Sequence, residues 1–375
     1  MITALYFSAA AILLLYAVFL LVPAFYFAFS GRAKEENYSP ETFISVILPV
    51  RNEEKNIATC LESLDGMNYP KSKFEILLIN DHSTDRTKAI AEQFAKLIPN
   101  LKIIDNLSGS EGKKSAITLG IKSAEGKIIA TTDGDCIVPE KWLLNIAEEF
   151  EKHDAVFVAG PVAYKKGFKV FRDLLQIEQI VLQVVSAGAM KMGFPLMCSG
   201  ANLAYQKQFF LDCGGYENDR FASGDDMMLM LKARNLRKDK IRFINKKDSI
   251  VWTNPATGFS VAIGQRSRWI SKFSAYSSGL TGVMGILVFL ANIMLPVLAL
   301  ISLWNPAILQ VFLSALVLKM LIDLLLLSLA VPFFREPRLL LLAPSGEVFY
   351  PFLTLFSTFA RLSGSFSWKG RKWTT

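Results

Sequence analysis

The longest hydrophobic runs lie at the two ends of the chain. Residues 4–29 carry no charged side chain, and a helix needs about 20 apolar residues to cross the hydrocarbon core of a bilayer. Two further apolar runs, 279–304 and 306–331, meet at Asn305-Pro306, which is a turn signal. The pattern therefore predicts an N-terminal transmembrane helix within 1–31 and a transmembrane hairpin at 279–334.

A fourth apolar stretch, residues 337–360, is interrupted by the sequence APSGEVFYP, which contains Glu347. Such an interrupted run favours a re-entrant or interfacial segment over a clean crossing. Residues 335–375 are thus expected to form this segment and a basic cytoplasmic tail. Within the third run, Lys319 and Asp323 lie four residues apart and are expected to neutralise each other on one helix face.

Basic residues flank each apolar run on the same expected side. They are Arg32 and Lys34; Arg266, Arg268 and Lys272; Arg335 and Arg338; and Arg361, Lys369, Arg371 and Lys372. Because Lys and Arg accumulate in cytoplasmic loops, these positions predict an integral protein of the cell (inner) membrane. The central domain, 32–255, would lie in the cytoplasm, followed by an amphipathic interfacial segment at 256–278.

The central domain alternates between strand-like and helix-like patterns. Continuous apolar runs predict strands at 43–50, 74–80, 101–105 and 128–132, and helical spacing predicts helices at 52–64, 84–97, 113–124 and 140–151. Strands that are apolar along their whole length are typical of a parallel sheet covered on both faces. The predicted fold class is α/β, with a Rossmann-like, mostly parallel sheet and helices on both faces.

Composition supports a membrane protein with one water-facing domain. Of the 375 residues, 52% are hydrophobic and 20% are charged, and the formal net charge is +8. Eight basic residues against one acid fall within 232–247. This segment could be a solvated face or bind nucleic acid, but next to membrane helices anionic lipid headgroups are the favoured partner. No nucleic acid is therefore expected, and the cysteine spacing suggests neither a zinc site nor disulfides.

Acidic residues follow three of the predicted strands. Glu53 follows the first strand, Asp81 the second, and Asp133 and Asp135 the fourth. One such acid is usually a helix cap, but the carboxyl ends of parallel strands meet at one edge, where ligands bind. Carboxylates without His or Cys suit Mg²⁺ or Mn²⁺, which typically bridge carboxylates to substrate phosphates. The pattern predicts such a cation at this edge.

Several stretches also carry a family resemblance. In chain order they are SVILPVRNEEKNI (45–57), INDHSTDRT (79–87), EGKKSAITLGIKSAEGKIIATTDGDC (111–136), SGANLAYQKQFFLDCGGY (199–216), SGDDMML (223–229), QRSRW (265–269) and WKGR (368–371). Together they resemble the membrane-bound branch of glycosyltransferase family 2, which includes cellulose-synthase-like and ceramide-glucosyltransferase-like enzymes. The resemblance implies a catalytic domain of the GT-A fold.

The resemblance also implies roles for individual residues. For nucleotide-sugar binding it points to Pro49, Arg51, Glu53, Asp81, Lys113 and Asp133. For the metal it points to Asp135 with Asp133, and for the general base to Asp226 beside Asp225. On the acceptor and diphosphate side it points to Gly200, Asn202, Gln265, Arg266, Arg268 and Trp269. Two positions depart from the family pattern, since Asp225 replaces the usual Glu and Thr118 stands where many members have Asn.

The implied activity is inverting transfer of a sugar from a nucleotide-sugar, expected to be a UDP-sugar, to a membrane lipid or glycolipid. A processive β-polysaccharide synthase is the alternative within the same class. From another class, the chain could be a non-catalytic nucleotide-sugar-binding subunit of an envelope assembly complex. Few membrane spans favour the lipid acceptor, because an exported polymer needs a channel.

Overall fold

The computed structural model describes residues 2–31, 38–107, 112–167, 169–217, 224–271 and 279–362, and the backbone of 365–368 and 371–374. The chain divides into two compact units. The sheet unit consists of Gly31–Lys165 and Met197–Asn254, and the helical unit of Met1–Ser30, Lys166–Leu196 and Pro255–Thr375. Among the basic residues used for the topology prediction, Arg32, Lys34, Lys272 and Lys369 lie outside the described residues.

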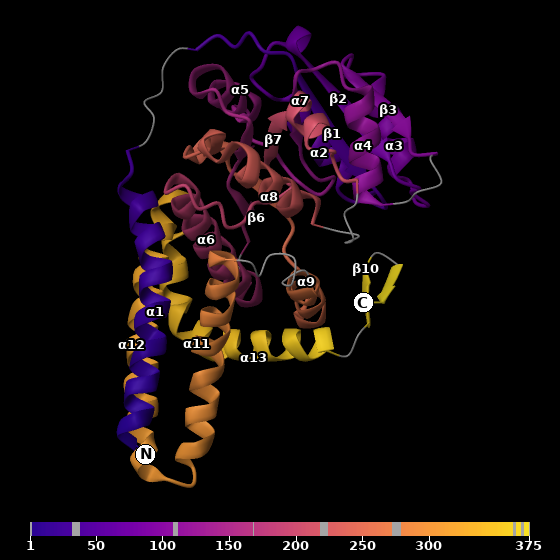
Figure 1. The fold of residues 1–375 in the computed structure, drawn as a ribbon. Coiled ribbons are helices and arrows are strands. Elements are labelled where there is room, and N and C mark those ends of the chain that lie inside the picture. The colour runs from indigo at the N-terminus through magenta and orange to yellow at the C-terminus, as the bar shows by residue number, and fades with distance from the viewer. Residues whose placement is uncertain are drawn as a thin grey trace. The chain divides into compact units, whose positions relative to one another are not determined.

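The sheet unit is built on a seven-stranded sheet with the strand order β3-β2-β1-β4-β7-β5-β8 (Figure 1). Its strands are β1 (Ile44–Val50), β2 (Phe74–Asn80), β3 (Leu101–Asp105), β4 (Ile128–Thr131), β5 (Phe157–Ala159), β7 (Leu203–Gln206) and β8 (Ile241–Phe243). Only β7 runs antiparallel to its neighbours, β4 and β5. The prediction of a mostly parallel sheet is confirmed.

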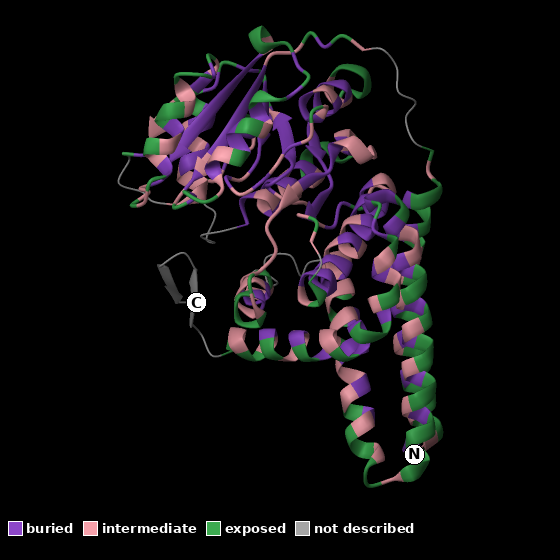
Figure 2. Cartoon of the chain, turned by 180° about the vertical axis from the view of Figure 1, so that it is seen from behind, coloured by how far each residue is buried: buried purple, intermediate pink, exposed green. Residues whose placement is uncertain are grey.

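Helices cover both faces of this sheet, because its central strands are apolar throughout. The helices of the unit are α2 (Ile57–Asp65), α3 (Thr87–Ala95), α4 (Lys113–Ser123), α5 (Trp142–His153), α7 (Lys207–Asp212) and α8 (Asp225–Arg237), with 3-10 turns η1 (Lys71–Lys73), η2 (Lys238–Lys240) and η3 (Lys247–Ser249). Figure 2 shows the strands almost wholly buried. Val46 and Leu48 pack into the core with α2 and α5. On the opposite face, a Cβ at Gly120 of α4 would lie 2.7 Å from Ile47.

Two short strands precede the points where the chain leaves the sheet unit. β6 (Val162–Tyr164) and β9 (Val251–Thr253) pair in parallel, with Tyr164 opposite Thr253. The chain passes into the helical unit one residue after each strand, since the unit boundaries follow Lys165 and Asn254. Both connections to the helical unit therefore begin directly after this pair of strands.

The helical unit contains the apolar helices. Its elements are α1 (Ile2–Phe29), α6 (Val170–Lys191), α9 (Phe259–Ser271), α11 (Leu280–Ser302), α12 (Pro306–Phe334), η4 (Pro337–Leu342), α13 (Ala343–Leu362), and the strands β10 (Ser365–Trp368) and β11 (Arg371–Thr374). Within the part of the chain that the structure describes, four helical segments are long and apolar enough to cross a membrane, namely α1, α11, α12 and Pro337–Leu362. In Figure 1, α1, α11 and α12 run alongside one another, whereas α13 lies across their direction.

The structure assigns residues 166–196 to the helical unit, whereas the sequence predicted one continuous domain at 32–255. Their helix, α6, packs with the apolar helices of the helical unit. The approach of α6 to α1 is close, because a Cβ at Gly188 would lie 1.8 Å from the carbonyl oxygen of Pro23. Long-range packing of this kind leaves no local signal in the sequence.

A buried ionic cluster joins three helices of this unit. The ammonium of Lys319 lies 2.7 Å from Asp323, as expected from their spacing, and 2.9 Å from Glu347 of α13. The Tyr16 hydroxyl of α1 donates to Asp323 at 2.6 Å. Lys319 is only 1% exposed, so its charge is neutralised within the protein.

The basic segment 232–247 is partly paired inside the sheet unit. Lys240 contacts Asp154 at 2.7 Å, Lys246 contacts Glu148 at 2.5 Å, and Lys232 donates to the carbonyl of Gly215. These pairs reduce the positive charge that the segment can offer to lipid headgroups. The lipid interaction of this segment stays a prediction.

Candidate active site

Three strand ends bring polar residues to one edge of the sheet. The register pairs Val50 with Asn80 and Ile47 with Thr131, so β1, β2 and β4 end near one another. The Asp81 amide also donates to the carbonyl of Val50 at 2.8 Å. The segments that follow these strands contain the predicted acids.

Gly134 separates Asp133 from Asp135 for a packing reason. A Cβ at this position would lie 3.0 Å from Val50 and 3.1 Å from the Cγ of Glu53. Such distances are tighter than most real contacts, so a side chain here would push Glu53 away. The glycine lets the loop after β4 lie directly against the loop after β1.

Asp81 has several polar partners and is 5% exposed. Its carboxylate accepts hydrogen bonds from the Gly112 amide at 3.1 Å and from Asn106 Nδ2 at 3.1 Å. The His82 Nδ1 lies 3.2 Å from Asp81 Oδ1. These partners follow β2 and β3 and precede α4.

Glu53, which follows β1, is also buried. Its Oε2 accepts from Asn56 at 2.8 Å, and its amide donates to Thr87 Oγ1 at 2.7 Å. Pro49, in β1, and Arg51, which follows β1, are both half-buried. All four predicted nucleotide residues of the first two strand ends therefore lie on this edge.

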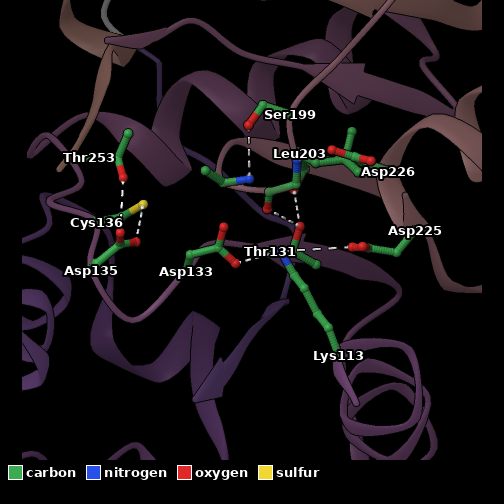
Figure 3. A network of polar contacts seen from close by, with 12 residues as sticks. Lys113, Thr131, Asp133, Asp135, Cys136, Ser199, Leu203, Asp225, Asp226 and Thr253 are labelled. Atoms are coloured by element: carbon green, nitrogen blue, oxygen red, sulfur yellow. Dashed lines mark hydrogen bonds and ion pairs between the residues drawn. The ribbon is translucent and has the colours of Figure 1, made fainter. Parts of the chain in front are cut away.

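Lys113, the first residue of α4, bridges acids from separate elements (Figure 3). Its Nζ lies 2.5 Å from Asp133 and 3.9 Å from Asp225. Burial alone would lower the pKa of Lys113, but Asp133 and Asp225 outweigh it and raise that pKa above its ordinary value. Lys113 is therefore a permanent cation at this edge.

Asp225 and Asp226 open α8, directly after Gly224, whose φ is 88°. Asp226 accepts a hydrogen bond from the Gly200 amide at 3.0 Å. A Cβ at Gly200 would lie 3.2 Å from Lys113 Nζ and 3.3 Å from Asp225 Oδ2. Gly200 thus lets Lys113 and the two aspartates meet.

Burial raises the pKa of Asp225, Lys113 lowers it, and Asp226 and Asp133 raise it again, so that the net shift is upward. Its carboxylate is consequently more costly to ionise than an exposed one. The structure brings Lys113, Asp133, Gly200, Asp225 and Asp226 into one cluster. Their roles in binding and catalysis stay predictions.

Asp133 and Asp135 could hold a cation together. One ligand atom from each of Asp133, Asp135 and Cys136 falls within 4.8 Å of the others. Thr253 Oγ1 also donates to Asp135 Oδ2 at 3.3 Å. Burial, together with both acids, raises the pKa of the Cys136 thiol well above its usual value. The two carboxylates are the hard oxygen donors that suit Mg²⁺ or Mn²⁺.

Asn202 has several hydrogen-bond partners within the sheet unit. Its side chain is buried, accepting from Trp142 Nε1 at 2.8 Å and donating to the carbonyls of Pro161 and Ser249, each at 2.9 Å. These bonds hold three segments together. The role of Asn202 on the acceptor or diphosphate side stays a prediction.

The QRSRW residues lie in α9 of the helical unit. Arg266 is buried and donates through Nε to Glu178 of α6 at 3.2 Å. Its guanidinium lies 5.6 Å from the ring of Trp269, which is 39% exposed. Gln265 is half-buried, and burial lowers the pKa of Arg268. The acceptor or diphosphate role of these four residues stays a prediction.

The sequence reasoning missed several polar residues that contact the predicted ones. Asn106 directly follows β3, so extending the search to that strand end would have found it. Thr253 and Glu178 lie far in sequence from Asp135 and Arg266, and no local pattern marks them. His82 was missed because its left-handed backbone, with φ of 59°, is not visible in its residue type.

Comparisons with known proteins agree with this architecture. The family model described as Glycosyl transferase family 2 matches residues 45–213. The glycosyltransferase AglE of Haloferax volcanii is 43% identical over 101 residues, which are 27% of this chain and 33% of AglE. The probable glycosyltransferase YdaM of Bacillus subtilis is 28% identical over 268 residues, covering 69% of this chain and 62% of YdaM.

A beta-monoglucosyldiacylglycerol synthase of Nostoc sp. is 34% identical over 127 residues, covering 33% of this chain and 27% of the synthase. The chain thus spans less than two thirds of the length of each of these relatives. Among solved structures, the mannosyltransferase PcManGT of Pyrobaculum calidifontis, in complex with GDP-Man and Mn²⁺, aligns with a TM-score of 0.61 at 18% identity. The alignment covers 96% of this chain and 99% of that one.

The mostly parallel sheet with its acidic carboxyl edge and the fold shared with PcManGT define a GT-A domain flanked by apolar helices. Residues 45–213 of the chain match the model of glycosyltransferase family 2, and the relatives named above carry the names of glycosyltransferases.

Proposed function

We propose that the chain is a metal-dependent, inverting glycosyltransferase that moves a sugar from a nucleotide-sugar to a lipid at the membrane surface. The observation that carries the proposal is the cluster around Gly200, where Lys113 lies 2.5 Å from Asp133 and 3.9 Å from Asp225, with Asp226 beside them. A cation and neighbouring acids at one sheet edge suit a diphosphate leaving group and an attacking hydroxyl.

The donor would bind across the strand ends. Pro49, Arg51, Glu53 and Asp81 would hold the nucleoside, and Lys113 would contact the diphosphate. Asp133 and Asp135 would hold a divalent cation, Mg²⁺ or Mn²⁺, which supplies positive charge to the leaving diphosphate. PcManGT, which shares the fold, was solved with GDP-Man and Mn²⁺.

Asp226 would act as the general base. In the reaction the acceptor oxygen bonds to the anomeric carbon while the bond from that carbon to the phosphate oxygen breaks. The acceptor proton passes to Asp226, and the nucleoside diphosphate leaves with the bonding electron pair. A single displacement inverts the anomeric carbon. Asp226 suits this role because the Gly200 amide holds its carboxylate at 3.0 Å.

The acceptor would be a lipid or glycolipid. The apolar helices α1, α11 and α12 support an integral protein of the cell (inner) membrane, with the sheet unit in the cytoplasm by the distribution of Lys and Arg. One relative is named as a beta-monoglucosyldiacylglycerol synthase. Gln265, Arg266, Arg268 and Trp269 would line the acceptor side, with Arg266 held in place by Glu178.

The test uses the full chain in lipid nanodiscs with Mn²⁺, labelled UDP- and GDP-sugars, and added membrane lipids. Label in a lipid-soluble product that stays at one sugar per lipid supports the proposal. Label in a long polymer would instead identify a processive synthase. Binding of nucleotide-sugar without any transfer would identify a non-catalytic subunit. A chain that binds no nucleotide-sugar would refute all three hypotheses: the lipid glycosyltransferase, the processive synthase and the non-catalytic subunit.

A further inference from the structure

His82 adopts a backbone conformation that favours glycine. Its φ is 59°, in the left-handed region, and it directly follows the buried Asp81. Glycine would hold this conformation without steric cost, whereas a side chain is retained here against a penalty. Asn52, which follows β1, has a φ of 54° and accepts a hydrogen bond from the Thr84 amide at 2.8 Å. The His82 side chain likewise makes a polar contact, with the carboxylate of Asp81.

The contact of His82 with Asp81 determines which nitrogen of the imidazole ring carries the proton. An ionised carboxylate can only accept hydrogen bonds, and Asp81 already accepts from the Gly112 amide and from Asn106 Nδ2. The Nδ1 of His82, 3.2 Å from Asp81 Oδ1, must therefore be the donor. In a neutral imidazole the other nitrogen, Nε2, is then a hydrogen-bond acceptor. The His82 side chain is 35% exposed, so the ring can meet a ligand.

We propose that Asp81 and His82 together select guanine as the base of the donor, so that the donor is a GDP-sugar. This inference rests on the proposed function, in which Asp81 contacts the base. Guanine presents the N1–H and the 2-amino group side by side, and these two donors match the Asp81 carboxylate and His82 Nε2. Uracil presents one N–H between two carbonyl oxygens, one of which would face the Nε2 lone pair. The inference replaces the UDP-sugar that the family resemblance suggested.

The experiment compares nucleotide affinities of the full chain in detergent with Mn²⁺ by titration calorimetry. The ligands are GDP, UDP and inosine diphosphate, which is GDP without the 2-amino group. One hydrogen bond in a buried site corresponds to about a tenfold change in affinity. We expect GDP to bind about tenfold more tightly than either UDP or inosine diphosphate.

The His82→Gly variant should lose the preference for GDP over inosine diphosphate while keeping the fold, because its backbone already suits glycine. Asp154→Gly is the matched control, since Asp154 is exposed, has a φ of 48° and ends α5 away from the site. It should leave all three affinities unchanged.

Wild-type protein that binds UDP as tightly as GDP would overturn the inference and leave the proposed function standing. A preference for GDP over inosine diphosphate that survives in His82→Gly would overturn the role of His82. A chain that binds none of the nucleotides would overturn both the inference and the proposed function.

Discussion

The ammonium of Lys113 lies 2.5 Å from the carboxylate of Asp133. This ion pair joins the first turn of α4 to the loop after β4, and so fixes a cation beside the acids that would bind a metal. We expect Lys113→Met to weaken binding of nucleoside diphosphate by about 10–100-fold, because a charge-assisted hydrogen bond is lost. Calorimetry measures this. Lys114→Met is the matched neighbour, and a comparable loss there would show that general positive charge is responsible.

Asp226→Asn should lower transfer by about 10²–10⁴-fold, the usual contribution of a general base. The amide keeps the shape of the side chain, and the bonds that the change affects are those from the amides of Gly200 and Met227, so nucleotide affinity should change little. Initial rates of label transfer provide the measurement. Asp212→Asn, at the exposed end of α7, should leave the rate unchanged. A rate for Asp226→Asn within a few-fold of wild type would remove Asp226 as the base.

Chelation should abolish transfer, and either Mn²⁺ or Mg²⁺ should restore it. Of the three residues that could hold the ion, Asp133 and Asp135 offer the hard carboxylate oxygens that Mg²⁺ and Mn²⁺ prefer, while Cys136 offers a soft, buried thiol. Cys136→Ala should therefore retain metal-dependent activity within a few-fold, and Asp135→Ala should lose it. Titration of Mn²⁺ into chelated enzyme checks both. Loss of metal response in Cys136→Ala alone would contradict the assignment.

Asp225→Asn should stabilise the fold at neutral pH. The pKa of Asp225 is raised in the folded protein, so the folded state binds its proton more tightly than the unfolded state. Stability from this group is present below the unfolded pKa, about 3.9, and falls as pH rises through the raised folded value. Asn carries no charge, so the variant does not lose stability in this way. A gain of about 1 kcal/mol in the free energy of unfolding would raise Tm by about 2–4 °C at pH 7.

Thermal unfolding at pH 4 and pH 7 measures this effect, and the gain should shrink at the lower pH. Asp239→Asn, which is exposed beyond the end of α8, should not change Tm. A lower Tm for Asp225→Asn at pH 7 would mean that the ion pair with Lys113 outweighs burial.

Lys319→Met should strongly destabilise the helical unit. The half-buried Asp323 and the buried Glu347 lie 2.7 and 2.9 Å from Lys319 and would be left without their cation. Breaking one partner of a buried ion pair costs about 3–5 kcal/mol. The triple variant Lys319→Met, Asp323→Asn, Glu347→Gln should recover most of this loss, because no charge is then left buried. Tm in detergent measures both, and Gln310→Met on the exposed surface of α12 is the control.

The sequence allowed the core of the sheet unit to be predicted closely. β2 and β3 begin and end at the expected residues, Phe74–Asn80 and Leu101–Asp105, because apolar runs between breakers leave little choice. Glu53, Asp81 and Asp133 were found from one topological rule, that the carboxyl ends of parallel strands share an edge.

The starts of two helices were predicted too early, for local reasons. α2 begins at Ile57 instead of residue 52, because the Glu53 carbonyl accepts from both Asn56 and Ile57 and forms a turn. α3 begins at Thr87 instead of residue 84, because the Thr84 amide is taken by Asn52 and Asp85 caps Thr87. Side-chain competition for backbone amides, which hydrophobic periodicity does not register, decides such boundaries.

Contacts between distant segments could not be predicted at all. β6 pairs with β9, and α6 packs on α1, only because the folded chain brings them together. The same holds for the hydrogen bond from Trp142 to Asn202, which joins residues 60 positions apart in the sequence. Residue type and spacing indicate chemistry, but tertiary packing decides which polar groups contact one another.

The interleaving of the two units has a practical consequence for producing a water-soluble enzyme. Deleting residues 1–30 and 255–375 would leave α6 in the truncated chain after its packing partner α1 had been removed. Its exposed small-residue face around Gly188 would then promote aggregation. A soluble version should also replace Lys166–Leu196 with a short polar linker that joins the flanking residues. The remaining sheet unit would then lack α6, the helix whose packing partner has been removed.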